Sequence, residues 1–358
     1  MLAPPCDEDS AAREGRRKVT APLPAATLDW LLEPDPANPG VRYFSLRQLL
    51  DRPEHDPEVV EAQAAVMRSG PVPAILASQQ PEGYWQYPGP GYSTKYRGTV
   101  WQLIQLDRLG ADPLDARVRA ACEYVLAHTQ SSSGGFGARG GFRQKHPPPS
   151  TTIHCLNGNL LAALVNLGWR TDERVQRAID WQASSITGDP GFQYYSSGTS
   201  APGFACGVNQ GQPCAWGANK AVRALLAVPP GARDERVRRA LDAGATFLLS
   251  HDPAVADYPY TERVSSAWFH LSLPLSYWSD FLETAENLVG LGYGSDPRLD
   301  AAFDLLLRKR DADGRWRMES SINGKTWTDV EQKGQPSKWV TLRALTVISR
   351  AGRLKDLD

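Results

Sequence analysis

Three cysteines and a histidine could together bind a metal ion. His154 and Cys155 are adjacent, and Cys206 and Cys214 stand at the two ends of a glycine- and glutamine-rich stretch. Cysteine sulfur and histidine nitrogen are typical ligands of Zn²⁺ in structural sites. The sequence has no Cys-x-x-Cys pair, so a zinc site requires that the fold bring these residues together. In the alternative interpretation, Cys155 and Cys214 are small apolar residues of helices and Cys206 is a loop thiol.

Two carboxylates lie one helical turn apart at the start of an apolar run. Asp280 precedes this run, and Glu283 follows three residues later. If apolar side chains surround its carboxyl group, Asp280 can act as a general acid on an alkene or an epoxide. The same pattern also predicts an aspartate N-cap, with Glu283 completing a capping box. The two roles are compatible, and we treat both residues as candidate catalytic residues.

Aromatic side chains are the third candidate group, because the chain has 11 tryptophans. The face of an aromatic ring attracts cations, including carbocations. The candidates for lining a substrate cavity are Trp101, Trp216, Trp268, Trp278 and Phe281. The alternative is that these rings are ordinary core.

A sequence motif that begins with Gln and ends with Gly and an aromatic residue recurs along the chain. It covers residues 79–85 and 130–136, and looser copies cover residues 182–192 and 310–316. Gln79, Gln130 and Gln182 are 51 and 52 residues apart. A fixed period near fifty residues is typical of repeat architectures.

Each repeat contains a pair of predicted helices. The first helix is apolar, and its periodicity predicts residues 100–109, 156–167, 215–228, 281–291 and 339–348. The first four end at Gly110, Gly168, Pro229 and Gly292, which are normal helix stops. The second helix is amphipathic and is predicted to begin at Asp112-Pro113, Asp172-Glu173, Asp234-Glu235 and Asp296-Pro297. A partial unit covers residues 41–50 and 58–67.

The repeated motif between paired helices resembles the QW-type repeat of squalene–hopene cyclases and oxidosqualene cyclases. The resemblance covers roughly residues 41–350. Protein prenyltransferase β-subunits share that fold. The resemblance implies an all-α fold, an α/α toroid of five to six helical hairpins, forming one domain over residues 25–358. It also implies a central cavity for an isoprenoid or similar apolar ligand, and in prenyltransferases a zinc ion.

The chain departs from these families in its acid motif. It has no Asp-x-Asp-Asp sequence, and the nearest match is residues 279–286, which is similar to the single-Asp motif of oxidosqualene cyclases but lacks its Cys. In a toroid the inner helices run parallel, so the residues that open them should meet at one rim. We therefore expect His154, Cys155, Cys214 and Asp280 at that rim, where helix N-termini favour thiolates and carboxylates.

Composition narrows the class of protein. The net charge is −1, which argues against a nucleic-acid partner. No apolar run is long enough to span a bilayer, although peripheral membrane contact is compatible with the sequence. Residues 1–24 carry mixed charges and predict a disordered tail rather than a signal peptide. Five cysteines are too few for a disulfide scaffold, and we expect a cytoplasmic protein.

The sequence is compatible with three functions. The first is a terpenoid cyclase or isomerase with Asp280 as the acid. The second is a non-catalytic toroid, stabilised by zinc, that binds a lipid or a protein partner. The third is a prenyltransferase-like enzyme, which would need an Asp and a Cys close together on one helix.

Overall fold

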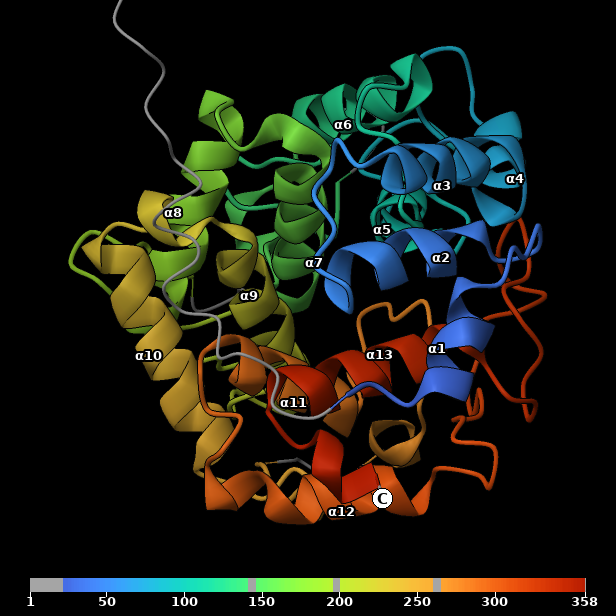
Figure 1. Ribbon diagram of the computed structural model, residues 1–358. Helices are drawn as coiled ribbons and strands as arrows, with labels where there is room; N and C mark the ends of the chain where they lie inside the picture. Colours follow the sequence, from blue (N-terminus) through green and yellow to red (C-terminus); the bar gives the residue numbers. More distant parts are fainter. Residues whose placement is uncertain (1–21, 141–145, 196–199, 260–264, 358) are drawn as a thin grey trace, which may run out of the picture.

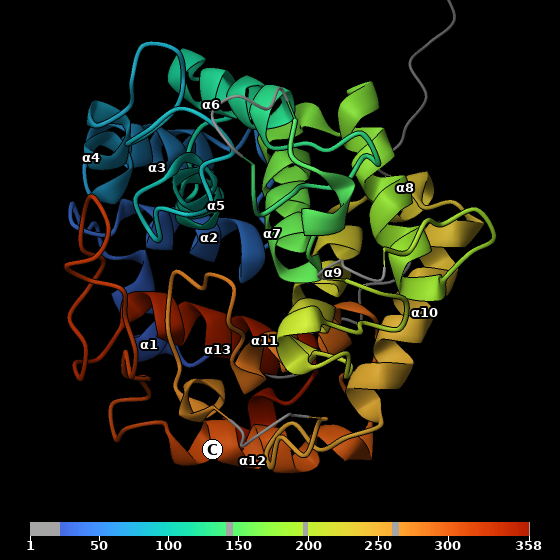
Figure 2. The same cartoon turned by 180° about the vertical axis from the view of Figure 1, so that it is seen from behind.

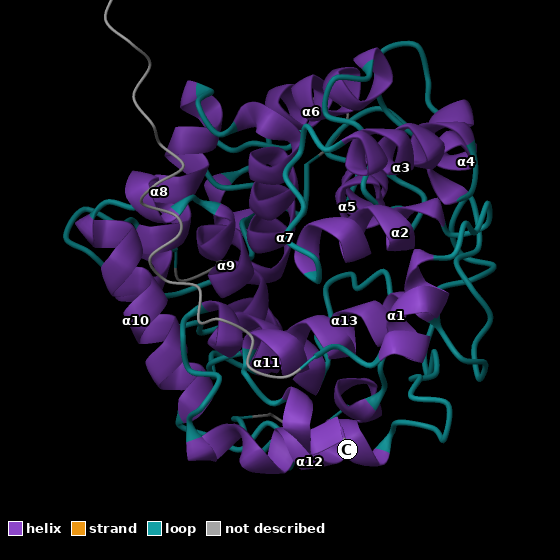
Figure 3. Ribbon diagram, viewed as in Figure 1, coloured by secondary structure: helices purple, strands orange, loops and turns teal. Residues whose placement is uncertain are grey.

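The computed structural model describes residues 22–140, 146–195, 200–259 and 265–357. In these ranges the chain forms helices joined by turns and loops, and strand pairing is limited to isolated bridges (Figure 3). The α-helices are α1 (Ala25–Leu32), α2 (Pro39–Gln48), α3 (Pro57–Arg68), α4 (Pro71–Ala77), α5 (Thr99–Leu109), α6 (Ala116–His128), α7 (His154–Leu164), α8 (Glu173–Thr187), α9 (Ala215–Ala227), α10 (Glu235–Leu249), α11 (Phe281–Gly290), α12 (Asp300–Arg308) and α13 (Lys338–Arg350). The predicted all-α class is confirmed. Most of the predicted tail, residues 1–21, lies outside the described residues.

Alternate helices follow one another around the centre of the molecule. α5 packs on α7, α7 on α9, α9 on α11, α11 on α13, and α13 on α2 (Figure 1). Gly40 of α2 lies against the carbonyl oxygen of Leu109 at the end of α5, so α2 returns to the start of the series. The partners α3, α6, α8, α10 and α12 pack on the outside against α2, α5, α7, α9 and α11 (Figure 2). This order of contacts is compatible with a toroid, which stays a prediction.

Aspartate N-caps begin most of the outer helices. The side chains of Asp172 and Asp234 accept a backbone N–H from the first turn of α8 and α10, as the sequence predicted. α6 begins later than predicted, at the N-cap Asp115. The reason is that Asp112 instead accepts from the backbone N–H of Leu114, in the turn before the helix.

The helices α7 and α9 approach each other closely because Gly158 lies between them. A Cβ atom at Gly158 would stand 2.3 Å from the carbonyl carbon of Lys220, which is far inside van der Waals contact. Only a glycine allows the two backbones this distance. The approach brings the polar residues in the middle of α9 to the centre of the molecule.

None of the described helices is both long enough and apolar enough to cross a membrane.

Candidate functional site

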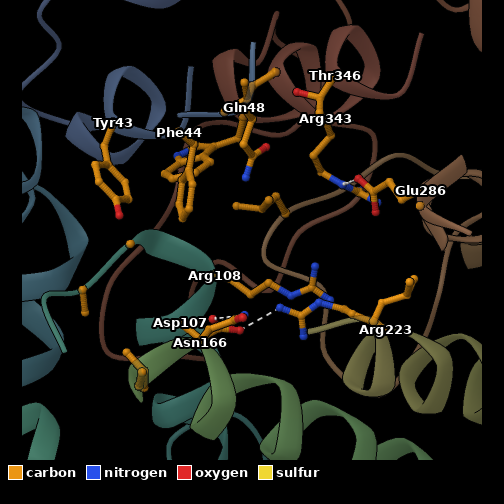
Figure 4. A pocket seen from close by; sticks show the side chains of 18 of the residues that line it. Tyr43, Phe44, Gln48, Asp107, Arg108, Asn166, Arg223, Glu286, Arg343 and Thr346 are labelled. Atoms are coloured by element: carbon orange, nitrogen blue, oxygen red, sulfur yellow. Dashed lines mark hydrogen bonds and ion pairs between the residues drawn. The ribbon is translucent and has the colours of Figure 1, made fainter. Parts of the chain in front are cut away.

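A cavity of about 960 Å³ lies where the helices around the centre end (Figure 4). Its lining includes Gln48 of α2, Arg108 of α5, Arg223 of α9, Val289 of α11 and Arg350 of α13, all close to the carboxyl ends of their helices. Asn166 to Gly168, just after α7, complete the same wall. These helices therefore run in the same sense, as the toroid prediction requires. The cavity is at their carboxyl ends, whereas the candidate site residues were predicted from the sequence at their amino ends.

The cavity has an apolar wall and a charged wall. Apolar side chains come mainly from α2, α9, α11 and α13: Phe44, Leu226, Val289, Trp339, Leu342 and Val347. The charged wall contains Asp107, Arg108 and Arg223, and a second charged pair, Glu286 and Arg343, lies on the other side of the cavity (Figure 4). Such a cavity suits a ligand that has both an apolar part and a polar part.

Glu283 is the centre of a buried ionic cluster next to the charged wall. Its carboxylate accepts hydrogen bonds from Arg108 Nη2 at 2.7 Å, from Ser279 Oγ at 2.7 Å, and from Lys220 Nζ. Burial raises the pKa of Glu283, but the Lys220 and Arg108 cations outweigh this and hold it well below its usual value. Burial lowers the pKa of Lys220 to about 8. Glu283 therefore joins α11 to α5 and α9.

Asp280 holds the guanidinium group of Arg343. The two carboxylate oxygens lie 2.9 and 3.0 Å from Arg343 Nη1 and Nη2, and one of them also accepts the backbone N–H of Glu283 at 2.8 Å. The predicted N-cap is confirmed. The capping box is only half formed, because the Glu283 side chain bonds to the cations of the cluster instead of the amide of Asp280. A carboxylate with these donors is arranged as an acceptor.

Asp107 plays a corresponding part at the other side of the cavity. It accepts from Asn166 Nδ2 at 2.8 Å and from Arg223 Nη2 at 2.7 Å. Across the cavity, Glu286 accepts from Arg343 Nε at 2.8 Å and Nη2 at 3.0 Å. Asp107 and Glu286 therefore each already have a guanidinium partner.

Three of the five predicted aromatic residues lie together at the amino ends of α5, α9 and α11. The ring of Tyr277 lies 6.2 Å from Trp101, 6.1 Å from Trp216 and 5.4 Å from Trp278. Trp268 and Phe281 are instead buried in the core. Among the lining residues of the 960 Å³ cavity, none of these five predicted tryptophan and phenylalanine positions occurs.

The three predicted thiol ligands are neighbours near the amino ends of α7 and α9. A hydrogen bond from Cys214 lowers the pKa of Cys206 to about 6, and the same bond raises the pKa of Cys214. Burial, and next the charge of Cys206, raise the pKa of Cys155 to about 12. The structure thus pairs Cys206 with Cys214, and Cys155 lies near enough for the charge of Cys206 to act on it.

His154 does not fit the predicted zinc site. Its Nε2 lies 3.1 Å from the carbonyl oxygen of Ala201, and its Nδ1 lies 3.3 Å from Gln182 Nε2, so both ring nitrogens have protein partners. Burial lowers the pKa of His154 to about 4, so the ring is neutral. Within the described ranges, no group of three or more His, Cys, Asp and Glu side chains is arranged to hold a metal ion. The zinc site stays a prediction.

Sequence reasoning gave no role to Arg108, Lys220 and Arg223, which form the charged side of the site. The sequence does contain a signal for these three residues, since they are ionisable and lie inside the predicted apolar helices 100–109 and 215–228. A charged side chain that is buried needs a partner of opposite charge. Those partners lie on other helices, far away in the sequence.

Comparisons with known proteins give no family for the chain. No family model matches it, and no curated protein matches it. One similar solved structure is a protein from Actinoplanes, with 15% identity, coverage of 82% of this chain and 99% of that chain, and a TM-score of 0.26. Another is a type II terpene cyclase from Scytonema in complex with its substrate geranylgeranyl dihydroxybenzoate, with 12% identity, coverage of 80% and 96%, and a TM-score of 0.27.

Proposed function

We propose that this chain binds an isoprenoid-like ligand in the cavity at the carboxyl ends of the helices around the centre. The observation that carries the proposal is the cavity itself, about 960 Å³ in volume, with both apolar and charged side chains in its lining. Its volume falls at the upper end of the range for small-molecule pockets, roughly 300–1,000 Å³. In such pockets apolar side chains supply affinity, and a few polar groups fix the orientation of the ligand.

The apolar wall supports an elongated apolar ligand. Phe44, Leu226 and Leu342 come from three different helices and all line the cavity. An isoprenoid chain would cover these side chains and remove their apolar surface from water, which is favourable in proportion to the area buried. The isoprenoid class itself comes from the sequence resemblance.

A binding role accounts for the site better than proton transfer from Asp280. Neither Asp280 nor Glu283 is among the lining residues of this cavity. Both carboxylates already accept hydrogen bonds from cations that their own chain provides. A general acid must instead present a proton to the bound substrate at hydrogen-bond distance.

The proposal is tested by measuring the affinity of the full chain for farnesol and geranylgeraniol by fluorescence titration. We expect saturable binding that Leu226→Trp weakens, because the larger side chain fills the cavity. Val255→Phe is the control, since Val255 is exposed on the surface and lies outside the lining. Saturable binding that is equally strong in wild type and Leu226→Trp would contradict the proposed site.

The cyclase alternative has a separate test. Purified protein is incubated with squalene, oxidosqualene and geranylgeranyl substrates, and the products are analysed by mass spectrometry. The binding role predicts no cyclised product. A product that wild type forms and Asp280→Asn does not form would replace the binding role with the cyclase function.

A further inference from the structure

We propose that Arg108 and Arg223 form an oxyanion site in the cavity wall, which binds the carboxylate or phosphate head group of the ligand. This inference rests on the cavity of the proposed function and names the polar end of its ligand. Arg108 stands near the end of α5, and Arg223 stands in the second half of α9. Figure 4 shows their guanidinium groups pointing toward one another at the edge of the cavity.

Both guanidinium groups have hydrogen-bond donors that the described residues do not satisfy. Arg108 donates from Nη2 to Glu283, but its buried Nε has no acceptor. Arg223 donates from Nη2 to Asp107, but its buried Nη1 has no acceptor. A guanidinium group has five N–H donors, and a buried donor without an acceptor costs free energy. An oxyanion between the two groups would supply the missing acceptors.

The balance of charge in this part of the wall also favours a bound anion, because cations outnumber carboxylates there. The side chains of Lys220, Arg108 and Arg223 are three cations, and within the described part of the chain their ion pairs are made with two carboxylates, Glu283 and Asp107. Burial, and next the like charge of Arg223, lower the pKa of Arg108. A negatively charged ligand would relieve the repulsion between the two guanidinium groups.

The charges of Glu283, Asp107 and Glu286 all act on Arg108, and of these three Glu286 is the one whose ion pair lies with Arg343 instead of Arg108 or Arg223. Both of its oxygens accept hydrogen bonds from Arg343, which also binds Asp280. Glu286 is therefore held toward the opposite side of the cavity. An oxyanion next to Arg108 and Arg223 would lie away from that carboxylate.

The geometry of the two donors indicates the class of ligand. Guanidinium groups bind planar carboxylates and phosphates through paired N–H donors, which a neutral hydroxyl cannot match. The apolar wall begins beside Arg223, at Leu226 on the same helix face. The expected ligand is thus an isoprenoid-like amphiphile with an anionic head group. This group can be a carboxylate or a phosphate, since both present the oxyanion that the two arginines would bind.

Four probes separate the head group from the chain: farnesol, farnesoic acid, farnesyl phosphate and inorganic pyrophosphate. Their affinities for the full chain are measured by calorimetry. We expect the two anionic farnesyl probes to bind roughly tenfold to a hundredfold more tightly than farnesol. We also expect added NaCl to weaken the anionic probes more than farnesol, because salt screens the charges.

Variants of Arg223 test whether this preference depends on the arginine pair. Arg223→Gln should remove most of the preference for an anionic head, and Arg223→Lys should keep part of it, because lysine retains the charge but not the paired donors. Arg236→Gln, on the outer helix α10, is the matched control and should change nothing. If Arg223→Gln does not fold, the Arg223→Lys and NaCl measurements still decide the question.

The outcomes distinguish this inference from the proposed function. Equal affinity for farnesol and the anionic farnesyl probes would overturn the oxyanion site and leave isoprenoid binding intact. Binding of pyrophosphate, lost in Arg223→Gln, without binding of any farnesyl probe would support the oxyanion site and overturn the isoprenoid ligand. Binding of none of the four probes would overturn both.

Discussion

Asp280, the N-cap of α11, and Glu283, in the first turn of this helix, bind different cations. Glu283 faces Lys220 and Arg108, whereas Asp280 caps the helix and binds Arg343. All of these side chains are buried or nearly so, and a buried ion pair loses much of its attraction to desolvation. The contribution of this cluster to stability therefore depends more on which residues pair with each other than on the number of ion pairs. A carboxylate that two cations share is harder to replace than one of its cations.

The first prediction compares Glu283→Gln with Lys220→Met. Glu283→Gln leaves Lys220 and Arg108 buried without this carboxylate, and we expect the free energy of unfolding to fall by about 3–5 kcal/mol. Lys220→Met should cost about half as much or less, because Glu283 keeps Arg108 and the apolar chain is retained.

Urea unfolding followed by circular dichroism measures both changes. Glu235→Gln is the control, since Glu235 is exposed in the first turn of α10 and should change stability by less than about 0.5 kcal/mol. Equal losses in Glu283→Gln and Lys220→Met would show that the carboxylate is not the shared centre of the cluster.

Residue types at the site could be predicted better than their partners. Asp280 was correctly identified as an N-cap, because capping depends on residues three positions apart. Its partner Arg343 is 63 residues away in the sequence, and Gln105 bonds to Thr326 across 221 residues. Such pairs depend on how the helices are arranged around the centre. No local pattern carries that information.

At the scale of elements, helix packing decides which polar groups reach the centre. Gly158 lets α7 and α9 approach, and Lys220 lies on α9 at the point of contact. The helices themselves were predicted well, because apolar periodicity and glycine stops are local features. For example, the predicted helix 215–228 is α9 at Ala215–Ala227, and 281–291 is α11 at Phe281–Gly290. Helices α1 and α4 were not predicted, since each has fewer than three turns.

The second prediction concerns this contact between α7 and α9. In Gly158→Ala the new methyl group meets the backbone of Lys220 at 2.3 Å, which cannot move aside as a flexible side chain would. We expect a loss of about 2 kcal/mol or more in the free energy of unfolding. Gly231→Ala is the matched control, because nothing lies within 4 Å of a Cβ at Gly231. A Gly158→Ala protein as stable as Gly231→Ala would contradict the close approach.

The third prediction concerns the thiols at the amino ends of α7 and α9. If Cys155, Cys206 and Cys214 bind zinc, the purified protein contains about one equivalent of the metal, and Cys206→Ser removes it. Cys6→Ser, which changes a cysteine outside this group, keeps it. Plasma mass spectrometry of protein dialysed against a weak chelator measures the content. Less than a tenth of an equivalent would remove the zinc prediction and leave a hydrogen-bonded thiol pair.

At the scale of the whole molecule, α2 and α13, which come from opposite ends of the described chain, complete the arrangement around the centre. Trp339 of α13 donates from Nε1 to Asn38 Oδ1 at 3.1 Å, across 301 residues of sequence. Its ring lies 6.1 Å from that of Phe44 on α2. Because Phe44 and Trp339 also line the cavity, the contact that closes the arrangement forms part of the ligand site.

The fourth prediction tests whether this closure is part of one cooperative structure. Gly40 lies between α5 and α13, and a Cβ there would stand 2.5 Å from the carbonyl oxygen of Leu109 and 2.7 Å from the ring of Trp339. Gly40→Ala should push α2 away from both helices and lower the free energy of unfolding by about 2 kcal/mol or more. It should also weaken ligand binding, because α2 carries part of the apolar wall.

Urea unfolding of Gly40→Ala is followed by tryptophan fluorescence and by far-ultraviolet circular dichroism. If the helices form one cooperative unit, both signals shift to lower urea together, since coincident transitions are expected when no intermediate is populated. A fluorescence transition at lower urea than the dichroism transition would mean that α1 and α2 detach alone, as a unit of lower stability. In that case α2 would be an appendage of the other helices, and the cavity would lose one of its walls before the molecule unfolds.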